Sequence, residues 1–569
     1  MTKFASRLGI LLLLTAALVN PSLADVTETF AQHHMVAAAN PLAAAAGLEM
    51  LRAHGSSVDA AIATQLVLNL VEPESSGLGG GAFMLVYDPK TKKTTSFDGR
   101  ELAPASATPG MFLDATGKPR AHQSPIPGGL SVGVPGVVAM LEMAHKKYGK
   151  LPWAKLFEPA IRIADEGFPV GPKLARTILN FQPRANMPDI KRTFYHPDGS
   201  PLKEGEILKS PEFAGALRAI AKGGSQAFYS GDIAQAIVDA VQHAPNQQGG
   251  MTLADLAGYK AVERPPVCGD YRAWQVCSMG PPSSGGIAIL EILGALQRFP
   301  SSDLQPGTVS EAHLFTQASR MAYADRVKYL ADPDFVSVPQ AGLIDKDYLA
   351  GRAALIDPAK DMGPATAGDP PVKHAALAPQ VSPVLHGTSH MTIVDDSGEV
   401  LAMTTSVETV FGAEIMARGF LLNNTLTDFS FDPVRDGLPV ANAPAPGKRP
   451  LSAMSPTIVF DKDHNFLLSV GSPGGPAIID YVAQTLVAML DGKMGPKDAI
   501  SLPRQLNMNG VTQLEKGPGV DALAAQLKAM GHNVQIPNAE GSGLHGIEKT
   551  AKGYIGAADP RRDGVALGD

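Results

Sequence analysis

The chain is poor in cysteine, tryptophan and aromatic residues in general. It has two cysteines and two tryptophans in 569 residues, and aromatic residues make up only 6% of it. No CxxC pair or histidine cluster accompanies the cysteines, so no metal site is expected. The net charge is −7, with acidic and basic residues interspersed. Because a surface that tracks phosphates needs a basic stripe, we expect no nucleic-acid partner.

Beyond its N-terminal region, the chain also lacks a hydrophobic run close to the ~20 residues that a membrane-spanning helix needs. Its N-terminus carries Lys3 and Arg7, then the apolar run 8–19, then the small-residue segment 22–24. This order is typical of a cleavable secretory signal peptide. We therefore expect residues 1–24 to be removed, leaving a periplasmic or secreted protein with no stable membrane span.

The two cysteines, Cys268 and Cys277, flank a segment with the pattern of a β-hairpin. A two-residue loop at Arg272-Ala273 would place them on opposite strands. An exported compartment permits a disulfide between them. Two unpaired buried thiols are the alternative.

Hydrophobic periodicity divides the chain into helical and strand-rich parts. Helices are predicted at 40–54, 57–71, across most of 132–246, and at 287–296, 475–491, 496–502 and 520–531. Strands are predicted at 82–87, 388–395, 400–407, 415–422, 455–460, 465–470 and in 545–558. The Pro-, Ala- and Gly-rich segment 356–387 resembles an exposed linker. Strands grouped before helices, after a helical first portion, predict a layered α/β fold.

Thr388 stands where this linker meets the strand predicted at 388–395. A threonine there could act as a hydroxyl nucleophile, and cleavage of the preceding bond would release an α-amine to serve as its base. By itself a threonine that opens a strand is more often a matter of β-propensity.

Several glycine-rich and polar motifs occur in an order that core packing does not require. They are 73–81 (PESSGLGGG), 98–104 (DGRELAP), 281–286 (PPSSGG), 388–390 (TSH), 423–424 (NN) with 428–429 (DF), 448–452 (KRPLS) and 471–475 (GSPGG). Because of these motifs, the chain resembles the γ-glutamyltranspeptidase (glutathione hydrolase) family of N-terminal-nucleophile hydrolases. The resemblance covers nearly all of the mature chain. The resemblance implies an αββα sandwich and no metal or organic cofactor.

By the same resemblance, Thr388 would attack the Gly387–Thr388 bond during maturation and then attack the substrate. The products would be a large subunit, 25–387, and a small catalytic subunit, 388–569, which stay together as a heterodimer. Ser406 matches a second hydroxyl near the nucleophile, where family members usually have threonine. Gly474 and Gly475 match paired glycines whose N–H groups resemble an oxyanion hole.

The substrate-binding residues are also implied by the resemblance. Arg100 matches the arginine that binds the substrate carboxylate, Asp428 and Glu408 lie where the ammonium is held, and Ser452 matches a serine that contacts the carboxylate. Two positions depart from the family pattern. Ala453 stands where a second serine is usual, and Thr425 where glutamine or glutamate is usual. Each departure removes a polar partner, which costs about 1.5 to 3 kcal/mol for a charged group.

The function implied is a self-processing γ-glutamyl hydrolase or transferase. It would act on glutathione and related small molecules, with water, amino acids or peptides as acceptors. An acylase with shifted specificity, such as a glutaryl-cephalosporin acylase or a relative acting on poly-γ-glutamate, is the alternative within the enzyme class. A non-catalytic periplasmic binding protein is the alternative outside it.

Overall fold

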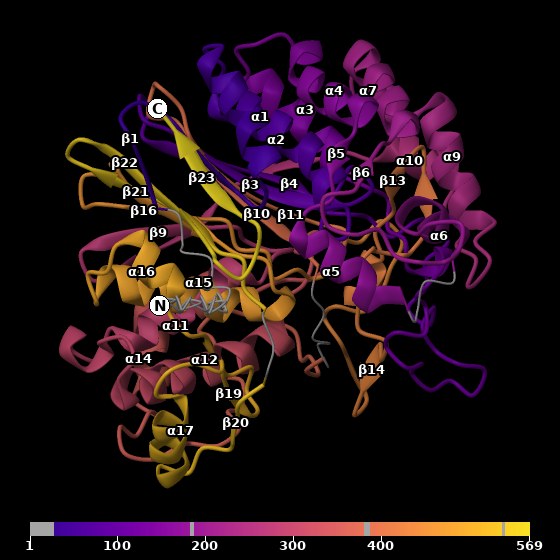
Figure 1. Cartoon of the computed structure of the whole chain (residues 1–569). Coiled ribbons are helices and arrows are strands. Elements are labelled where there is room, and N and C mark those ends of the chain that lie inside the picture. Colours follow the sequence, from indigo (N-terminus) through magenta and orange to yellow (C-terminus); the bar gives the residue numbers. More distant parts are fainter. Residues whose placement is uncertain (1–27, 183–186, 381–386, 538–540) are drawn as a thin grey trace, which may run out of the picture.

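Two seven-stranded β-sheets, stacked face to face, form the centre of the molecule (Figure 1). The computed structural model of the uncleaved chain describes residues 28–182, 187–380, 387–537 and 541–569. The predicted signal peptide, residues 1–24, lies outside these residues. Within them, no helix combines the length and the apolar character that crossing a membrane would require.

Both sheets are antiparallel throughout and combine strands from distant parts of the chain. The first, which we call the β10 sheet, has in order β23 (Val565–Gly568), β2 (Met35–Ala38), β10 (Ser389–Val394), β11 (Val400–Ser406), β3 (Gly81–Asp88), β4 (Lys93–Gly99) and β7 (Val262–Arg264). The second, the β17 sheet, has β1 (Thr29–Ala31), β22 (Gly553–Ala558), β21 (His545–Thr550), β17 (Phe466–Gly471), β16 (Thr457–Phe460), β9 (Trp274–Ser278) and β8 (Val267–Tyr271).

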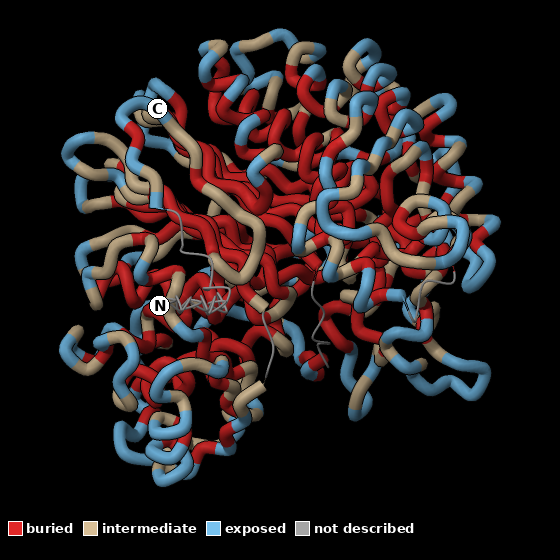
Figure 2. The backbone as a smooth tube through the Cα atoms, in the orientation of Figure 1, coloured by how far each residue is buried: buried red, intermediate tan, exposed pale blue. Residues whose placement is uncertain are grey.

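Strand alternation explains why the sheets are covered on both faces. On β10, Met391 and Ile393 join the core beneath the helices, whereas Thr392 points to the β17 sheet and donates to Ser469 Oγ across 2.7 Å. On β3, Phe83 and Leu85 lie between the sheets. Side chains two residues apart share a face, so each strand contributes to two hydrophobic layers. Figure 2 shows this burial as a continuous buried centre.

Helices cover the outer face of each sheet, which confirms the αββα arrangement expected from the sequence. The β10 sheet contacts α1 (Pro41–Arg52), α2 (Ser57–Val71) and α3 (Val137–Tyr148). The β17 sheet contacts α11 (Gly285–Leu296), α15 (Ile478–Leu490) and α16 (Pro496–Ser501). As predicted, Asn40 caps α1, because its side chain accepts from Leu42 N at 2.9 Å.

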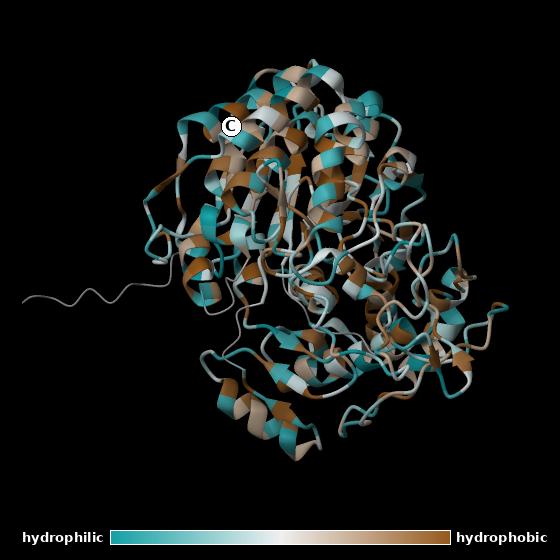
Figure 3. Ribbon diagram, turned by 90° about the vertical axis from the view of Figure 1, so that its right-hand side faces the viewer, coloured by the Kyte–Doolittle hydropathy of each residue, from teal (hydrophilic) through white to brown (hydrophobic). Residues whose placement is uncertain are grey.

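Smaller elements surround this sandwich. Figure 3 shows that the outer helices carry both hydrophilic and hydrophobic residues. The other helices are α4 (Glu158–Glu166), α5 (Pro172–Phe181), α6 (Pro188–Phe194), α7 (Pro211–Gly223), α8 (Gln226–Tyr229), α9 (Gly231–Gln242), α10 (Leu253–Gly258), α12 (Val309–Tyr329), α13 (Gln340–Leu343), α14 (Lys346–Ala353) and α17 (Val520–Ala529). The short strands are β5 (Phe168–Pro169), β6 (Ile207–Leu208), β14 (Val434–Arg435), β15 (Leu438–Pro439), β18 (Gln505–Leu506), β19 (Thr512–Leu514) and β20 (Val534–Gln535).

Two local features differ from or add to the sequence expectations. The single strand predicted at 415–422 is wrong: the segment is a hairpin of β12 (Met416–Ala417) and β13 (Phe420–Leu421). Arg418 and Gly419 turn the chain with φ of 46° and 80°, the left-handed values that tight hairpins require. The β8–β9 hairpin has the predicted register, and a disulfide joins Cys268 to Cys277.

Candidate active site

Thr388 lies immediately before β10 and is 4% exposed. Its Oγ1 donates to the carbonyl oxygen of Gly387 across 2.6 Å. Ser406, at the end of the neighbouring β11, donates its hydroxyl to the same carbonyl oxygen across 2.5 Å and lies 3.1 Å from Thr388 Oγ1. Two hydroxyl groups therefore converge on the carbonyl of the predicted scissile bond.

Local crowding fixes the residue that precedes Thr388. A Cβ placed on Gly387 would lie 2.5 Å from the carbonyl oxygen of Glu408 and 2.8 Å from the carbonyl carbon of Thr409. Real Cβ atoms do not approach backbone this closely. Only glycine at position 387 lets the backbone pack this closely against residues 408–409. That neighbouring segment is held in place by Ser406, whose Oγ accepts a hydrogen bond from Glu408 N at 2.8 Å.

Two contacts between the sheets indicate which part of the β17 sheet faces Thr388. Thr392 is bonded to Ser469, and the His390 ring lies against Gly471, where any Cβ would overlap it. Moving back two residues along β10, from Thr392 to His390, therefore moves the contact forward two residues along β17, from Ser469 to Gly471. By the same registry, Thr388 would lie opposite residue 473, directly before the glycine pair, Gly474 and Gly475. Their φ values of 138° and 57° suit glycine and form an irregular turn ahead of α15.

His390, the third residue of the TSH motif, forms its hydrogen bond with Thr404 and not with Thr388. Its Nδ1 lies 2.9 Å from Thr404 Oγ1 on the neighbouring strand, and it is fully buried between the sheets. Burial, with His545 nearby, lowers the pKa of His390 well below its usual value. A neutral, buried imidazole here fills space and bonds to a strand hydroxyl.

Arg100 and Asp428 are brought into direct contact. Arg100 Nη2 donates to Asp428 Oδ2 across 2.5 Å, and Arg100 is only 1% exposed. Burial acts to lower the pKa of Arg100, but Glu101 and Asp428 outweigh it and the pKa is raised. The guanidinium also donates to the carbonyls of Pro450 and Leu451, each across 3.1 Å. The cation is thereby held beside the segment that leads into Ser452.

Glu408 joins the same charged group. Burial, followed by the neighbouring Asp428 carboxylate, raises the pKa of Glu408 well above its usual value, and Arg100 opposes the rise. The negative charge of Asp428 beside it favours a proton on Glu408. Glu101 Oε2 also lies 3.4 Å from Arg100 Nη1, so Glu101, Glu408, Asp428 and Arg100 form one cluster of three acids and one cation.

The residues that depart from the family pattern lie around this cluster. Thr425 is buried and donates its hydroxyl to Glu101 Oε1 across 2.8 Å, so it bonds to the cluster through Glu101 and not through Arg100 or Asp428. Ser452 and Ala453 are 5% and 8% exposed, and Ser452 Oγ accepts from Met454 N. The hydroxyl and the N–H of Ser284, in the 281–286 motif, both donate to the Ser452 carbonyl. The structure therefore brings Arg100 and Asp428 into contact, whereas Thr425 bonds to Glu101. Ser452 and Ala453 follow the two carbonyls that accept from Arg100.

Sequence reasoning missed the charged groups behind Thr388. Ser389 donates to Glu72 Oε2 across 2.6 Å, and Glu72 pairs with Lys173 of α5 at 2.6 Å. Arg562 donates to the carbonyl oxygen of Thr388 across 3.0 Å. These partners are far apart in the sequence, and only the fold brings them together. Glu72, directly before the 73–81 motif, was the one available signal.

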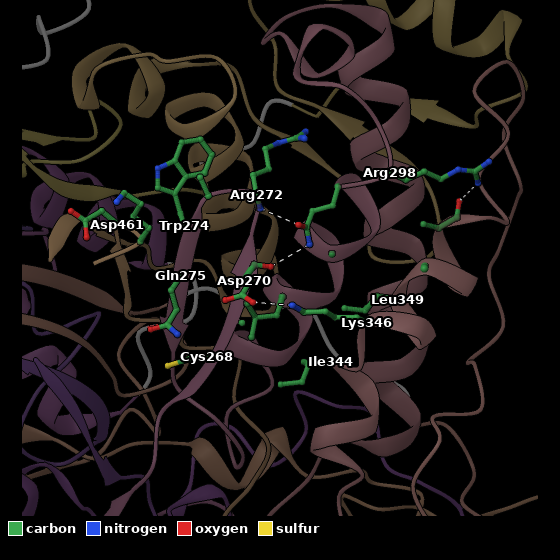
Figure 4. A pocket seen from close by; sticks show the side chains of 18 of the residues that line it. Cys268, Asp270, Arg272, Trp274, Gln275, Arg298, Ile344, Lys346, Leu349 and Asp461 are labelled. Carbon is green, nitrogen blue, oxygen red and sulfur yellow. Dashed lines mark hydrogen bonds and ion pairs between the residues drawn. The ribbon is translucent and has the colours of Figure 1, made fainter. Parts of the chain in front are cut away.

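A large cavity lies elsewhere, beside the β8–β9 hairpin (Figure 4). It has a volume of about 1020 Å³, and its lining includes Cys268, Asp270, Trp274 and Lys346. None of the predicted catalytic or substrate-binding residues lines it. Among the described residues, no group of three or more His, Cys, Asp or Glu side chains could hold a metal ion.

Two stacked antiparallel sheets between helical layers, with a buried threonine hydroxyl at the start of a central strand, define an N-terminal-nucleophile hydrolase. The family model for gamma-glutamyltranspeptidase matches residues 43–569. The chain belongs to the gamma-glutamyltranspeptidase family.

Relatives and a solved structure agree with this assignment. The chain is 39% identical to the glutathione hydrolase proenzyme of Bacillus subtilis (strain 168), covering 94% of this chain and 91% of that protein. It is also 39% identical to the glutathione hydrolase proenzyme of Escherichia coli (strain K12), covering 93% and 91%. Among solved structures, cephalosporin acylase from Bacillus halodurans matches with a TM-score of 0.85 and 29% identity, over 98% of this chain and 99% of that one.

Proposed function

We propose that this enzyme is a γ-glutamyl hydrolase and transferase that activates itself by cleaving the Gly387–Thr388 bond. The observation that carries the proposal is the convergence of the Thr388 and Ser406 hydroxyls on the Gly387 carbonyl. Names of close relatives that contain "glutathione hydrolase" and "proenzyme" support it. The substrates would be glutathione and related small γ-glutamyl compounds.

Self-cleavage would begin with attack of Thr388 Oγ1 on the carbonyl carbon of Gly387. The C–N bond breaks, the hydroxyl proton passes to the leaving nitrogen, and the amide becomes an ester. Water then hydrolyses that ester, which leaves a carboxylate on Gly387 and regenerates the Thr388 hydroxyl. Thr388 now has a free α-amine, which can accept the hydroxyl proton in later turnovers.

Cleavage would leave two chains, 25–387 and 388–569, that share both sheets. In the β10 sheet, β10 and β11 from the second chain lie between β2 and β3 from the first. In the β17 sheet, β16 pairs with β9 across the same division. Because strand pairing and both cores cross the division, we propose that the products remain a non-covalent heterodimer. The N-terminal pattern in the sequence supports a periplasmic or secreted location.

In turnover, Thr388 Oγ1 would attack the γ-carbonyl carbon of the substrate while the α-amine accepts its proton. The N–H groups of Gly474 and Gly475 would stabilise the oxyanion. The leaving amine takes the proton, and a γ-glutamyl ester remains on Thr388. Water then yields glutamate, whereas the amine of an amino acid or peptide yields a new γ-glutamyl amide.

The charged cluster would hold the glutamyl head. A substrate carboxylate would bind Arg100 and Ser452, and its ammonium would bind Asp428 and Glu408. Arg100 and Asp428 pair with each other in the structure, so a zwitterionic head group would replace this internal ion pair with its own opposite charges. Retention of both charges favours a zwitterion over a ligand with a single charge.

A glutaryl acylase is the second candidate. Ala453 and Thr425 remove polar partners from the head-group site, and the cephalosporin acylase from Bacillus halodurans has the same fold over nearly the whole chain. A glutaryl group lacks the ammonium, however, and would leave Asp428 without a cationic ligand partner.

The two candidates are separated by comparing release of 4-nitroaniline from its γ-glutamyl and glutaryl amides. We expect the γ-glutamyl compound to have the higher kcat/KM. Thr388→Ala should abolish release, whereas the matched variant Thr388→Ser retains a nucleophile and should keep measurable activity. Faster glutaryl turnover would favour the acylase, and no turnover of either compound by the wild type would contradict the proposal.

A further inference from the structure

The carbonyl oxygen of Thr388 accepts a hydrogen bond from Arg562, which is only seven residues from the end of the sequence. This carbonyl belongs to Thr388 itself and lies on the other side of its Cα from the Gly387–Thr388 bond. The contact can therefore persist after that bond is cleaved. It holds the backbone from which the Thr388 hydroxyl projects.

The surrounding backbone is shaped to hold the Arg562 side chain. Its Nε donates to the Ser542 carbonyl across 3.3 Å. A Cβ on Gly543 would lie 2.5 Å from Arg562 Cδ and 2.6 Å from Nε, so the side chain lies directly on this glycine. Asp559 fixes the same loop, because it accepts from the Ser542 hydroxyl at 2.6 Å and from Leu544 N at 3.1 Å.

A second set of bonds holds the residue that follows Thr388. Ser389 donates to Glu72, which is fully buried in the charged group and paired with Lys173. Burial acts to raise the pKa of Glu72, but Lys173 and then Arg562 outweigh it, so the pKa is lowered. Arg562 thus stabilises the carboxylate that anchors Ser389 and also holds the Thr388 carbonyl.

We propose that Arg562 is a positioning residue for the nucleophile, which orients the Thr388 hydroxyl by holding the carbonyl of the same residue. This proposal rests on the proposed function of Thr388. Arg562 makes no contact with the scissile carbonyl, which Thr388 and Ser406 already bond. It acts by restricting the main chain of Thr388, because misplacement of a reacting group by about 1 Å can cost about 100-fold in rate.

Arg562 lines a cavity of about 500 Å³. This cavity allows the proposal to be tested by chemical rescue. Its lining includes Arg562, Asp563, Pro172 and Leu42. Removing the side chain of Arg562 would extend this cavity toward the Thr388 carbonyl. A free guanidinium ion could then enter and donate to that carbonyl in its place.

The test measures steady-state kinetics of the cleaved enzyme on a γ-glutamyl anilide, with rates normalised to the amount of free Thr388 N-terminus. We expect Arg562→Ala to lower kcat about 10- to 100-fold, with KM within about twofold of wild type, because the head-group site is separate. Arg562→Lys should recover part of the loss. Millimolar guanidinium chloride, well below denaturing concentrations, should raise kcat of Arg562→Ala, and the same concentration of sodium chloride should not.

Arg218→Ala is the matched control, since Arg218 pairs with Asp165 on the surface. It should leave kcat and KM unchanged. Unchanged kcat in Arg562→Ala would overturn the proposal, as would a loss that appears in KM alone or one that neither lysine nor guanidinium recovers. If Arg562→Ala does not fold, the proposal is judged on Arg562→Lys, which should lower kcat at unchanged KM. A wild-type enzyme that neither cleaves itself nor turns over the anilide contradicts the proposed function, and this inference falls with it.

Discussion

At the scale of single residues, the Gly387 carbonyl accepts hydrogen bonds from two hydroxyl groups, and the one from Ser406 can be removed while Thr388 itself is kept. We predict that Ser406→Ala slows self-cleavage about 10- to 100-fold, since the hydrogen bond that polarises the carbonyl is lost. Ser406→Thr keeps the hydroxyl and should cleave at a rate close to wild type. The measurement is the time course of the intact chain on denaturing gels.

The control for that prediction is Ser397→Ala, which removes a hydroxyl that donates to Asp395 in the turn between β10 and β11. It should cleave normally. Equal cleavage rates for Ser406→Ala and wild type would show that Ser406 does not assist the reaction.

At this scale the sequence could predict which residues belong to the site but not which side chains bond to one another. The family resemblance predicts that Thr388, Arg100 and Asp428 contact the substrate. It did not predict that Arg100 and Asp428 bond to each other, nor that Thr425 donates to Glu101. Those contacts depend on side-chain directions that local sequence does not determine.

At the scale of secondary-structure elements, β10 and β17 pack with Thr392 against Ser469 and His390 against Gly471, and the same registry would place Thr388 opposite residue 473. Gly471 lies against the His390 ring, and a Cβ there would overlap it. We predict that Gly471→Ala forces the two strands apart and lowers the free energy of unfolding by about 1 to 3 kcal/mol. It should also slow self-cleavage, because His390 is two residues from Thr388. Thermal unfolding and the gel assay measure the two effects.

Gly215→Ala is the matched control for this prediction. Gly215 lies within α7, and a Cβ there would meet nothing within 4 Å. Because alanine favours helix, the melting temperature should stay the same or rise slightly. A Gly471→Ala protein with unchanged melting temperature and unchanged cleavage would contradict the role given to the strand registry.

Element prediction from the sequence worked where the signal was local. The Asn40 cap and the helical periodicity located α1 and α2, and alternation located β10 and β11. It failed at 415–422, where two left-handed residues turn the chain and only one of them is glycine. The sequence analysis also did not predict the edge strand β23, Val565–Gly568, whose place beside β2 depends on a partner more than 500 residues away.

At the scale of the whole molecule, buried acids make stability depend on pH. Burial raises the pKa of Glu311 to about 8 and those of Glu399 and Asp480 to about 7. Unfolded carboxyls titrate near 4, so between these values the folded state binds more protons and stability falls as pH rises. Burial lowers the pKa of His532 and His545 to about 4, which has the opposite effect, but only below about pH 6.5.

The acids therefore dominate between about pH 6.5 and 8, and we predict that the melting temperature falls across this interval. Glu311 alone should contribute about 1.5 kcal/mol to the change. Glu311→Gln cannot titrate and should flatten the profile, whereas Glu212→Gln, exposed on α7, should leave it unchanged. Thermal unfolding at several pH values measures this. A melting temperature that rises from pH 6.5 to 8 would contradict the prediction.

The overall architecture was the most predictable property, because a family resemblance that covers nearly all of the mature chain also carries its fold. The positions of Arg562 and Lys173 were the least predictable, since their partners, the Thr388 carbonyl and Glu72, lie about 100 or more residues away in the sequence.

The central claim is that Thr388 becomes an N-terminal nucleophile, and intact-mass analysis with N-terminal sequencing of the purified protein tests it most directly. The wild type should yield two chains, one ending at Gly387 and the other beginning at Thr388, while Thr388→Ala should remain a single chain. A single intact wild-type chain, or a new N-terminus at any other residue, would contradict the account.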